Sequence, residues 1–213
     1  MRVYDFLEDV NCEIDSVVDI NRHDDSCIIS IPHGGTYMPE RYLEYYRERR
    51  HQMASADLYT REVHDVGVGT AIAFRLSQAV VNPSRKRDGD DDPDLPLHLQ
   101  HDPFHGNSLL GGPMTIKPIT DEMREEFLSY YDEYHQALAD AIADMKRKHG
   151  YALVIDGHSL FSVGLANVPD SGKERPDFDI GTLQGLSADK RLIHAFCDKL
   201  SREAAACGWD MMV

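Results

Sequence analysis

Residues 27–35 read CIISIPHGG, and residues 151–159 read YALVIDGHS. Each segment is a short, largely apolar run that stops at a glycine-containing loop, which is typical of a buried strand. Each also places a histidine, His33 or His158, just after its last apolar residue. Because ligands of open α/β sheets bind outside the carboxyl ends of the strands, we expect both histidines at one rim of a sheet. Three neighbouring glycines would let the backbone turn sharply and leave room for a ligand: Gly34, Gly35 and Gly157.

The rest of the chain alternates between helix and strand patterns. Apolar residues recur every three or four positions over residues 120–149, which predicts a long amphipathic helix. A second amphipathic helix is expected over residues 189–207, with Gly208 just beyond its end. This alternation favours an α/β protein, a three-layer α/β/α sandwich with a mostly parallel mixed sheet. The other expected elements are helices over residues 39–50 and 55–66, the latter capped by Ser55, and strands over residues 70–74, 78–82, 180–183 and 209–213.

The composition limits the classes of partner. The chain has 213 residues, and 37 acidic against 22 basic side chains give a formal charge of −15. Nucleic acids and anionic membrane surfaces need a basic face, so neither is expected as a partner. No apolar run approaches the roughly 18 residues of a membrane helix, and the N-terminus lacks a secretory signal pattern. Four scattered cysteines predict reduced thiols in a cytoplasmic protein. We expect one domain over residues 1–213, and the oligomeric state stays open.

The two histidines at the strand ends suggest a metal site, although loop histidines bonded to nearby carbonyls are the alternative. A catalytic zinc site usually has three ligands from His, Asp and Glu and one open position for water. No acid lies in the loop of His33, so the third ligand must come from elsewhere. Asp57 is the best candidate and Glu62 the reserve, but Asp57 could instead be a first-turn acid stabilised by a helix dipole. Asp156 is interpreted as the acceptor that orients His158.

A local positive patch stands out in this acidic chain, at Arg85, Lys86 and Arg87. The planar guanidinium of Arg85 could bind a substrate carboxylate through two hydrogen bonds. The equally supported alternative is a solvated turn whose cations offset the acidic run that follows at residues 88–94.

The irregular stretch over residues 83–118 carries three more histidines, His98, His101 and His105. They could form a second metal site, but without helical spacing or cysteines we interpret them as loop histidines. A loop of this length inside a compact domain is usually functional or mobile.

Five segments together resemble one known family, the N-formylglutamate amidohydrolases. They are SIPHGGTYMPE at residues 30–40, SADLYT at 55–60, VVNPSR at 80–85, YYDEYHQAL at 130–138 and VIDGHS at 154–159. The resemblance covers residues 28–213. It implies a fold similar to that of zinc carboxypeptidases and aspartoacylases.

What the resemblance implies for the site can be placed on this chain residue by residue. One zinc ion per chain would be bound by His33, Asp57 and His158. The residues assigned to substrate binding are Asn82, Arg85 and His135. The family hydrolyses N-formyl-L-glutamate to formate and L-glutamate at the end of a histidine-degradation route.

The sequence departs from the family pattern in two places. The usual Asn-Arg adjacency is spread here over residues 82–85, and the family continues with a stretch that carries a glutamate after the point where this chain ends. We therefore expect a domain that lacks a C-terminal portion, and we take Asp156 and Glu62 as the candidate catalytic carboxylates. The expected function is zinc-dependent hydrolysis of a small anionic N-acyl amino acid. A peptidase or deacylase of the same fold and a non-catalytic metal-binding domain are the alternatives.

Overall fold

The computed structural model describes residues 14–89, 103–104, 107–165, 169–211 and 213. The chain divides into two compact units, Met1–Ser159 and Leu160–Val213. The sheet and every described candidate site residue lie in the first unit.

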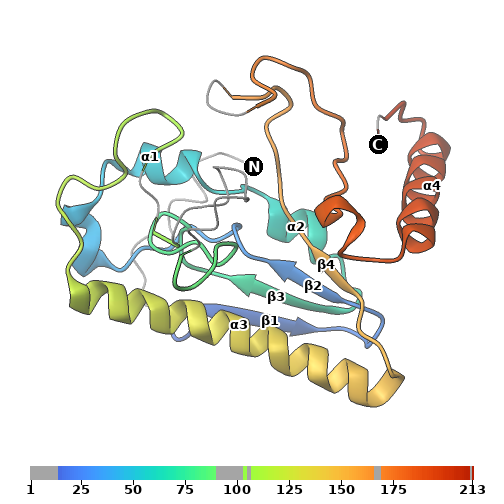
Figure 1. Ribbon diagram of the computed structural model, residues 1–213, viewed down its shortest axis with the longest axis horizontal. Coiled ribbons are helices and arrows are strands. Elements are labelled where there is room, and N and C mark those ends of the chain that lie inside the picture. The colour runs from blue at the N-terminus through green and yellow to red at the C-terminus, as the bar shows by residue number, and fades with distance from the viewer. Residues whose placement is uncertain (1–13, 90–102, 105–106, 166–168, 212) are drawn as a thin grey trace. The chain divides into compact units, whose positions relative to one another are not determined.

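The first unit is built on a four-stranded sheet with the order β1-β3-β2-β4 (Figure 1). Strand β2 runs parallel to β3 and β4, and β1 runs antiparallel to β3. The carboxyl ends of β2, β3 and β4 therefore share one edge of the sheet. This confirms the predicted α/β fold with a mostly parallel mixed sheet. The strands are β1 Val18–Arg22, β2 Ile28–Ile31, β3 Thr70–Phe74 and β4 Val154–Asp156.

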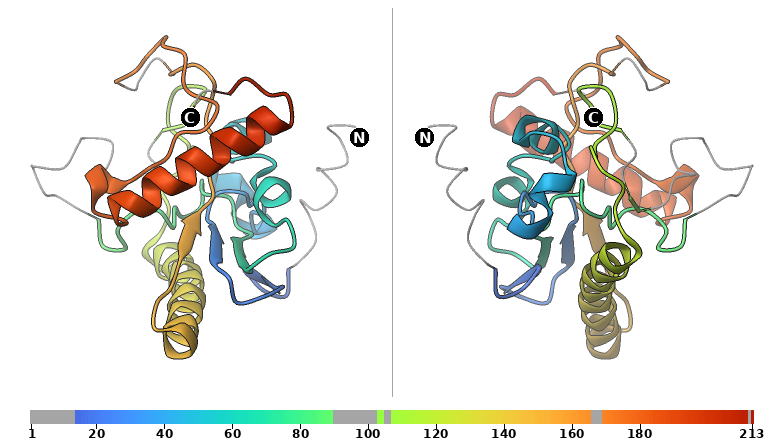
Figure 2. Two further views of the ribbon diagram at one scale, coloured as in Figure 1. Left: turned by 90° about the vertical axis from the view of Figure 1, so that its right-hand side faces the viewer. Right: turned by 90° about the vertical axis from the view of Figure 1, so that its left-hand side faces the viewer.

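Helix α3, Asp121–His149, runs along one face of this sheet (Figures 1 and 2). The hydroxyl of Thr120 accepts a hydrogen bond from the Met123 N–H, so it caps the first turn. Gly150 ends the helix at a φ of 79°, in the left-handed conformation. The predicted helix over residues 120–149 is thus confirmed. Half of its buried residues are aromatic, namely Phe127, Tyr131 and Tyr134.

The two faces of the sheet have separate apolar clusters, because successive strand residues point to opposite sides. Ile28, Ile72 and Phe74 pack with the helix α3 residues in the larger cluster. The smaller cluster on the other face contains Ile29, Ile31, Ala71 and Ala73, with Leu153 and Ile155 against it. Helix α2, Thr60–His64, contacts β2.

The helix predicted over residues 39–50 is divided in the structure. A 3₁₀ helix covers Glu40–Tyr45, and α1 covers Arg49–Ala54. Between them Tyr46 has extended backbone and a buried side chain, so it interrupts the helical path.

The helix predicted over residues 55–66 is shorter than expected. Ser55 is the C-cap of α1 rather than an N-cap, and α2 begins only at Thr60. The residue before α2 is Tyr59, whose φ of 66° lies in the left-handed region. A right-handed helix cannot run through that conformation, so the helix starts after it.

Three predicted strands, over residues 78–82, 180–183 and 209–213, do not form in the described part of the chain. The side chains of residues 79–82 are buried, but their backbone turns instead of pairing, with the Val80 N–H donating to the Ser77 carbonyl at 2.9 Å. A 3₁₀ helix occupies Leu183–Gly185. Conversely β1 was not predicted, since only Val18 of its five residues is buried and apolar periodicity is weak there.

The second unit contains α4, Lys190–Ala206, which confirms the helix predicted over residues 189–207. The Asp189 carboxylate accepts from the Arg191 N–H as an N-cap, and Gly208 follows the helix with a φ of 78°. Among the described residues, no helix combines the length and apolarity that a membrane crossing requires.

Candidate metal centre

A backbone hydrogen bond places Asp57 beside His33. His33 follows the carboxyl end of β2, and its carbonyl accepts from the Asp57 N–H at 3.0 Å. The Asp57 carbonyl in turn accepts from the Thr60 hydroxyl at 2.6 Å. Asp57 therefore lies three residues before α2 rather than in its first turn, and the helix-dipole interpretation of this acid does not hold.

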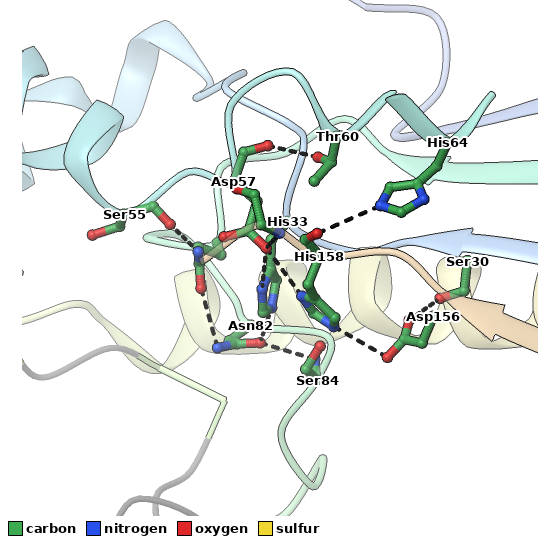
Figure 3. A network of polar contacts seen from close by, with 12 residues as sticks. Ser30, His33, Ser55, Asp57, Thr60, His64, Asn82, Ser84, Asp156 and His158 are labelled. Atoms are coloured by element: carbon green, nitrogen blue, oxygen red, sulfur yellow. Dashed lines mark hydrogen bonds and ion pairs between the residues drawn. The ribbon is translucent and has the colours of Figure 1, made fainter. Parts of the chain in front are cut away.

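His158, which follows β4, completes a group of three side chains (Figure 3). The Asp57 Oδ2 atom lies 3.0 Å from the Nδ1 atom of His158 and 3.6 Å from that of His33. The two imidazole ring centres are 4.7 Å apart. One potential ligand atom from each of the three residues lies within 4.8 Å of the others. The structure thus brings together the two histidines and the aspartate that the sequence predicted as a metal site.

The outward nitrogens of both histidines have side-chain acceptors. The Nε2 atom of His33 is 2.8 Å from the amide oxygen of Asn82, and that of His158 is 3.1 Å from Asp156 Oδ2. The Asn82 oxygen also accepts from the Ser84 N–H at 2.8 Å, which identifies it as the oxygen of the amide. With Nε2–H donated outward, the Nδ1 atom of each histidine faces Asp57, and it can bind a metal once it carries no proton. Two imidazole nitrogens and a carboxylate oxygen form a donor set that fits zinc.

Buried amides extend this arrangement behind His33. The Asn82 side chain is only 2% exposed, and its amino group donates to the Gln78 side-chain oxygen at 3.3 Å. The Gln78 amino group donates to the Ser55 carbonyl, two residues before Asp57. Asn82 thus orients a candidate ligand, and a direct substrate contact by Asn82 stays a prediction. The only sign of this network in the sequence is that Gln78 and Asn82 are polar residues next to the apolar residues 79–81.

Hydrogen bonds within the cluster shift the pKa values of Asp57 and His158 in opposite directions. Burial alone would raise the pKa of Asp57, but hydrogen bonds with His158 and His33 outweigh burial and hold the pKa well below its usual range. Burial alone would lower the pKa of His158, but hydrogen bonds with Asp156 and Asp57 raise it to about 9. Without a metal, a protonated His158 therefore supplies the positive charge between two carboxylates.

We expect the metal-free protein to lose stability through His158 as the pH rises. The pKa of about 9 in the folded state lies above the ordinary value of 6.5, so the folded state binds this proton more tightly. The resulting contribution to the free energy of unfolding is complete below about pH 6.5 and is lost as the pH rises through about 9. Urea unfolding with a chelator across this range measures it. His158→Gln is the control and should flatten this part of the profile; an unchanged slope would contradict the prediction.

The two predicted catalytic carboxylates occupy different surroundings. Asp156 is 56% exposed and contacts His158, and its Oδ1 atom accepts from the Ser30 hydroxyl at 2.6 Å. Glu62 is exposed in the first turn of α2 and is not part of the cluster. Of the two, only Asp156 is in contact with a candidate metal ligand.

A cavity of about 530 Å³ lies next to the cluster, between β2, β4, α3 and the segment after Asn82. The side chain of Arg85 is half-buried there, and burial lowers the pKa of its guanidinium. Within the described residues this guanidinium has no hydrogen-bond or ion-pair partner, unlike that of Arg87, which pairs with Asp132 at 2.7 Å. The cavity wall includes Ser30, Arg85, Lys86, Tyr131, His135 and Asp156.

His135 supports the segment that carries Arg85. Its Nε2 atom is 2.9 Å from the Pro83 carbonyl, and the Tyr131 hydroxyl donates to the Arg85 carbonyl at 2.8 Å. The rings of Tyr131 and His135 are in contact, with centres 4.2 Å apart and planes tilted by 37°. His135 also lines the cavity, so its predicted contact with substrate remains a prediction beside this structural contact.

Two other features of the long irregular stretch were named from the sequence. His98, His101 and His105, and Asp90–Asp94 of the acidic run, lie outside the described residues. Asp88, at the start of that run, pairs with Arg87 at 3.1 Å.

The three glycines beside the histidines are needed for close packing against protein groups. None of them has a positive φ. A Cβ atom at Gly157 would lie 2.7 Å from the His64 ring, and one at Gly34 would lie 2.8 Å from the Thr60 hydroxyl. At Gly35 it would lie 2.4 Å from backbone atoms of Phe74 and Arg75. The expected space is thus filled by neighbouring chain segments.

Gly35→Ala is therefore expected to lower the free energy of unfolding by about 3 kcal/mol or more, because the added methyl group collides with backbone that cannot move aside alone. Gly181→Ala is the matched control, since a Cβ atom there meets nothing within 4 Å. Denaturant unfolding of both variants measures the difference. Equal stability of the two variants would show that the Phe74–Arg75 backbone yields easily.

The fold and the site define an α/β protein with a two-histidine, one-carboxylate centre at the carboxyl edge of its parallel strands, beside a cavity that Arg85 lines. A family model described as N-formylglutamate amidohydrolase matches residues 25–212. The chain belongs to the N-formylglutamate amidohydrolase family, which confirms the prediction from the sequence motifs.

Individual relatives agree with this family. An N-formylglutamate deformylase of Pseudomonas aeruginosa is 29% identical over 191 residues, a match that covers 84% of this chain and 67% of the relative. One of Pseudomonas putida is 25% identical over 170 residues, covering 76% of this chain and 61% of the relative. The crystal structure of an N-formylglutamate amidohydrolase from Ralstonia eutropha superposes with a TM-score of 0.74 at 20% identity, over 93% of this chain and 75% of that chain. The chain therefore spans about two thirds of its curated relatives.

Proposed function

We propose that this protein hydrolyses N-formyl-L-glutamate to formate and L-glutamate with a zinc ion bound by His33, Asp57 and His158. The observation that carries the proposal is the convergence of one ligand atom each from His33, Asp57 and His158 within 4.8 Å, beside the cavity that Arg85 lines. Membership of the family and the names of the two curated relatives support the substrate. The proposal places the reaction at the end of histidine degradation, as the resemblance implies, and in the cytoplasm, as the scattered cysteines suggest.

The donor set determines what the metal would contribute. Zinc bound by two imidazoles and one carboxylate, with an open position, polarises an amide carbonyl and lowers the pKa of bound water to about 7. Asn82 and Asp156 would keep the imidazoles in the orientation that such binding requires. The Nδ1 atoms of His33 and His158 already face Asp57 Oδ2, at 3.6 Å and 3.0 Å.

Arg85 would hold the anionic part of the substrate. Its guanidinium is half-buried and unpaired among the described residues, so a carboxylate would gain two charge-assisted hydrogen bonds in a partly dehydrated place. The formal charge of −15 would otherwise repel such a substrate, so this local positive site matters for binding. Proton transfer to the leaving amine is assigned to Asp156, which faces the cavity, with Glu62 as the reserve.

Formate release tests the proposal directly. We expect the zinc-loaded chain to release formate from N-formyl-L-glutamate, with little release after chelation and recovery on adding zinc. Two analogues test the parts of the substrate that are recognised. N-formyl-L-glutamine lacks the side-chain carboxylate, and N-acetyl-L-glutamate carries an acetyl group in place of the formyl group. The P. aeruginosa deformylase is the positive control. Stoichiometric zinc without formate release would instead identify a non-catalytic metal pocket, and preference for a different acyl group would identify another deacylase.

A further inference from the structure

A line of hydrogen bonds runs from the buried face of α3 to His158, the candidate metal ligand that follows β4. The Tyr134 hydroxyl lies 2.8 Å from the Ser30 hydroxyl, and the Ser30 hydroxyl donates to Asp156 Oδ1 at 2.6 Å. Asp156 Oδ2 is 3.1 Å from Nε2 of His158 (Figure 3). The four residues come from α3, β2, β4 and the loop after β4.

The direction of these bonds follows from their chemistry. A carboxylate can only accept, so the single proton of Ser30 is donated to Asp156. The Ser30 oxygen must then accept the proton of Tyr134. Burial raises the pKa of the Tyr134 hydroxyl above its ordinary value, which keeps it protonated and able to donate. Both hydroxyls are buried, at 1% exposure for Tyr134 and 5% for Ser30, so each needs this partner.

The sheet register explains why Ser30 can reach Asp156. The two residues are direct partners across β2 and β4, and both side chains point toward α3. Asp156 itself is 56% exposed and belongs to a strand of three residues, so its own surroundings restrain it weakly. Tyr134 is fixed far better, because it lies within a 29-residue helix and packs against Phe74 with ring centres 5.3 Å apart.

We propose that Tyr134 is a positioning residue for the metal centre: through Ser30 it fixes the Asp156 carboxylate on the Nε2–H of His158, which keeps Nδ1 of His158 directed at Asp57. This deepens the proposed function, and it rests on that function only in treating the cluster as a zinc site. It also gives a role to the tyrosine that directly precedes His135 in the segment YYDEYHQAL.

Zinc affinity in a double-mutant cycle tests the proposal. Asp156→Asn should weaken zinc binding about tenfold or more. Tyr134→Phe retains the ring and loses only the hydroxyl, so it should weaken binding about fivefold, the effect of one hydrogen bond. The double variant should bind zinc no more weakly than Asp156→Asn alone, because both changes remove the same restraint. Competition with a chromophoric chelator measures all four proteins.

Tyr131→Phe is the matched control. It removes a hydroxyl from the same face of α3, but that hydroxyl donates to the Arg85 carbonyl, so its zinc affinity should equal that of the wild type. Unchanged zinc affinity in Tyr134→Phe, or effects of Tyr134→Phe and Asp156→Asn that multiply in the double variant, would overturn the proposal.

A readout without metal separates this proposal from the proposed function. In the zinc-free wild type, ¹⁵N-edited spectra should show a His158 Nε2–H proton protected from exchange with water, and Tyr134→Phe should lose that protection while Tyr131→Phe retains it. If no formate is released but this pattern and the zinc cycle hold, the proposed function fails and the positioning role stands. Loss of protection in both tyrosine variants, or in neither, contradicts the positioning role whatever the activity.

Discussion

Asp57→Ala is expected to bind zinc more than a hundredfold more weakly than the wild type. Structural zinc sites with four ligands bind with about 10–16 kcal/mol, so a single ligand accounts for roughly 3 kcal/mol. Asp57 contributes more than an average ligand here, since its Oδ2 atom faces the Nδ1 atoms of both histidines. Equilibrium competition and zinc content after gel filtration measure the change, and formate release should fall with the zinc content.

Asp65→Ala is the control for Asp57→Ala. Asp65 is similarly shielded, with a side chain 12% exposed, and it bonds to His23 and Asn21 away from the cluster. Its replacement should lower stability and leave zinc binding intact. His33→Ala and His158→Ala should behave like Asp57→Ala. If both histidine variants retained stoichiometric zinc, the ligand assignment would be wrong.

Arg85→Ala is expected to raise KM for N-formyl-L-glutamate roughly a hundredfold, since two hydrogen bonds to a charged group in a partly buried place are worth about 3 kcal/mol. The KM for a neutral N-formyl amino acid should change much less. Lysine at this position should restore only part of the affinity, because an ammonium group cannot form the paired contact. Steady-state kinetics with both substrates measure the difference.

Arg87→Ala controls for the loss of one positive charge from the same segment. Arg87 is already paired with Asp132 and Asp88 on the surface, so its removal should change KM little. Equal effects of Arg85→Ala on anionic and neutral substrates, or equal effects of the two arginine variants, would remove the proposed role of Arg85.

The parts of the site predicted from the sequence are those set by strand ends. His33 and His158 each follow an apolar run, and parallel pairing of β2 with β4 necessarily brings such residues to one edge. The long helix over residues 120–149 was predictable for a similar reason, because its apolar period and its Thr120 cap are local signals.

The parts that were missed depend on contacts between distant segments. Asp57 was predicted as a ligand but placed at a helix start, whereas a hydrogen bond to the His33 carbonyl holds it. The spacing of apolar residues in the sequence gives no sign of that hydrogen bond. Residues 79–82 are buried like a strand, yet their backbone turns within the core. Strand β1 pairs with β3, but only one of its five side chains is buried, so its sequence lacks the apolar pattern of a strand. Ser30 was a visible interruption in an apolar run, but its partner Tyr134 lies 104 residues away.

The hydrogen bond between the Asp57 N–H and the His33 carbonyl holds two candidate ligands together. The third candidate ligand, His158, follows β4 and lies 101 residues after Asp57 in the sequence. A zinc ion bound by all three would therefore act as a removable crosslink between distant segments of the folded chain, and it would stabilise the folded state because the unfolded chain has no such site. Zinc binding would mainly stabilise the attachment of strand β4, because this strand has only three residues and pairs with β2 alone among the described strands. The availability of the metal would thus determine how stably β4 remains paired at the edge of this sheet.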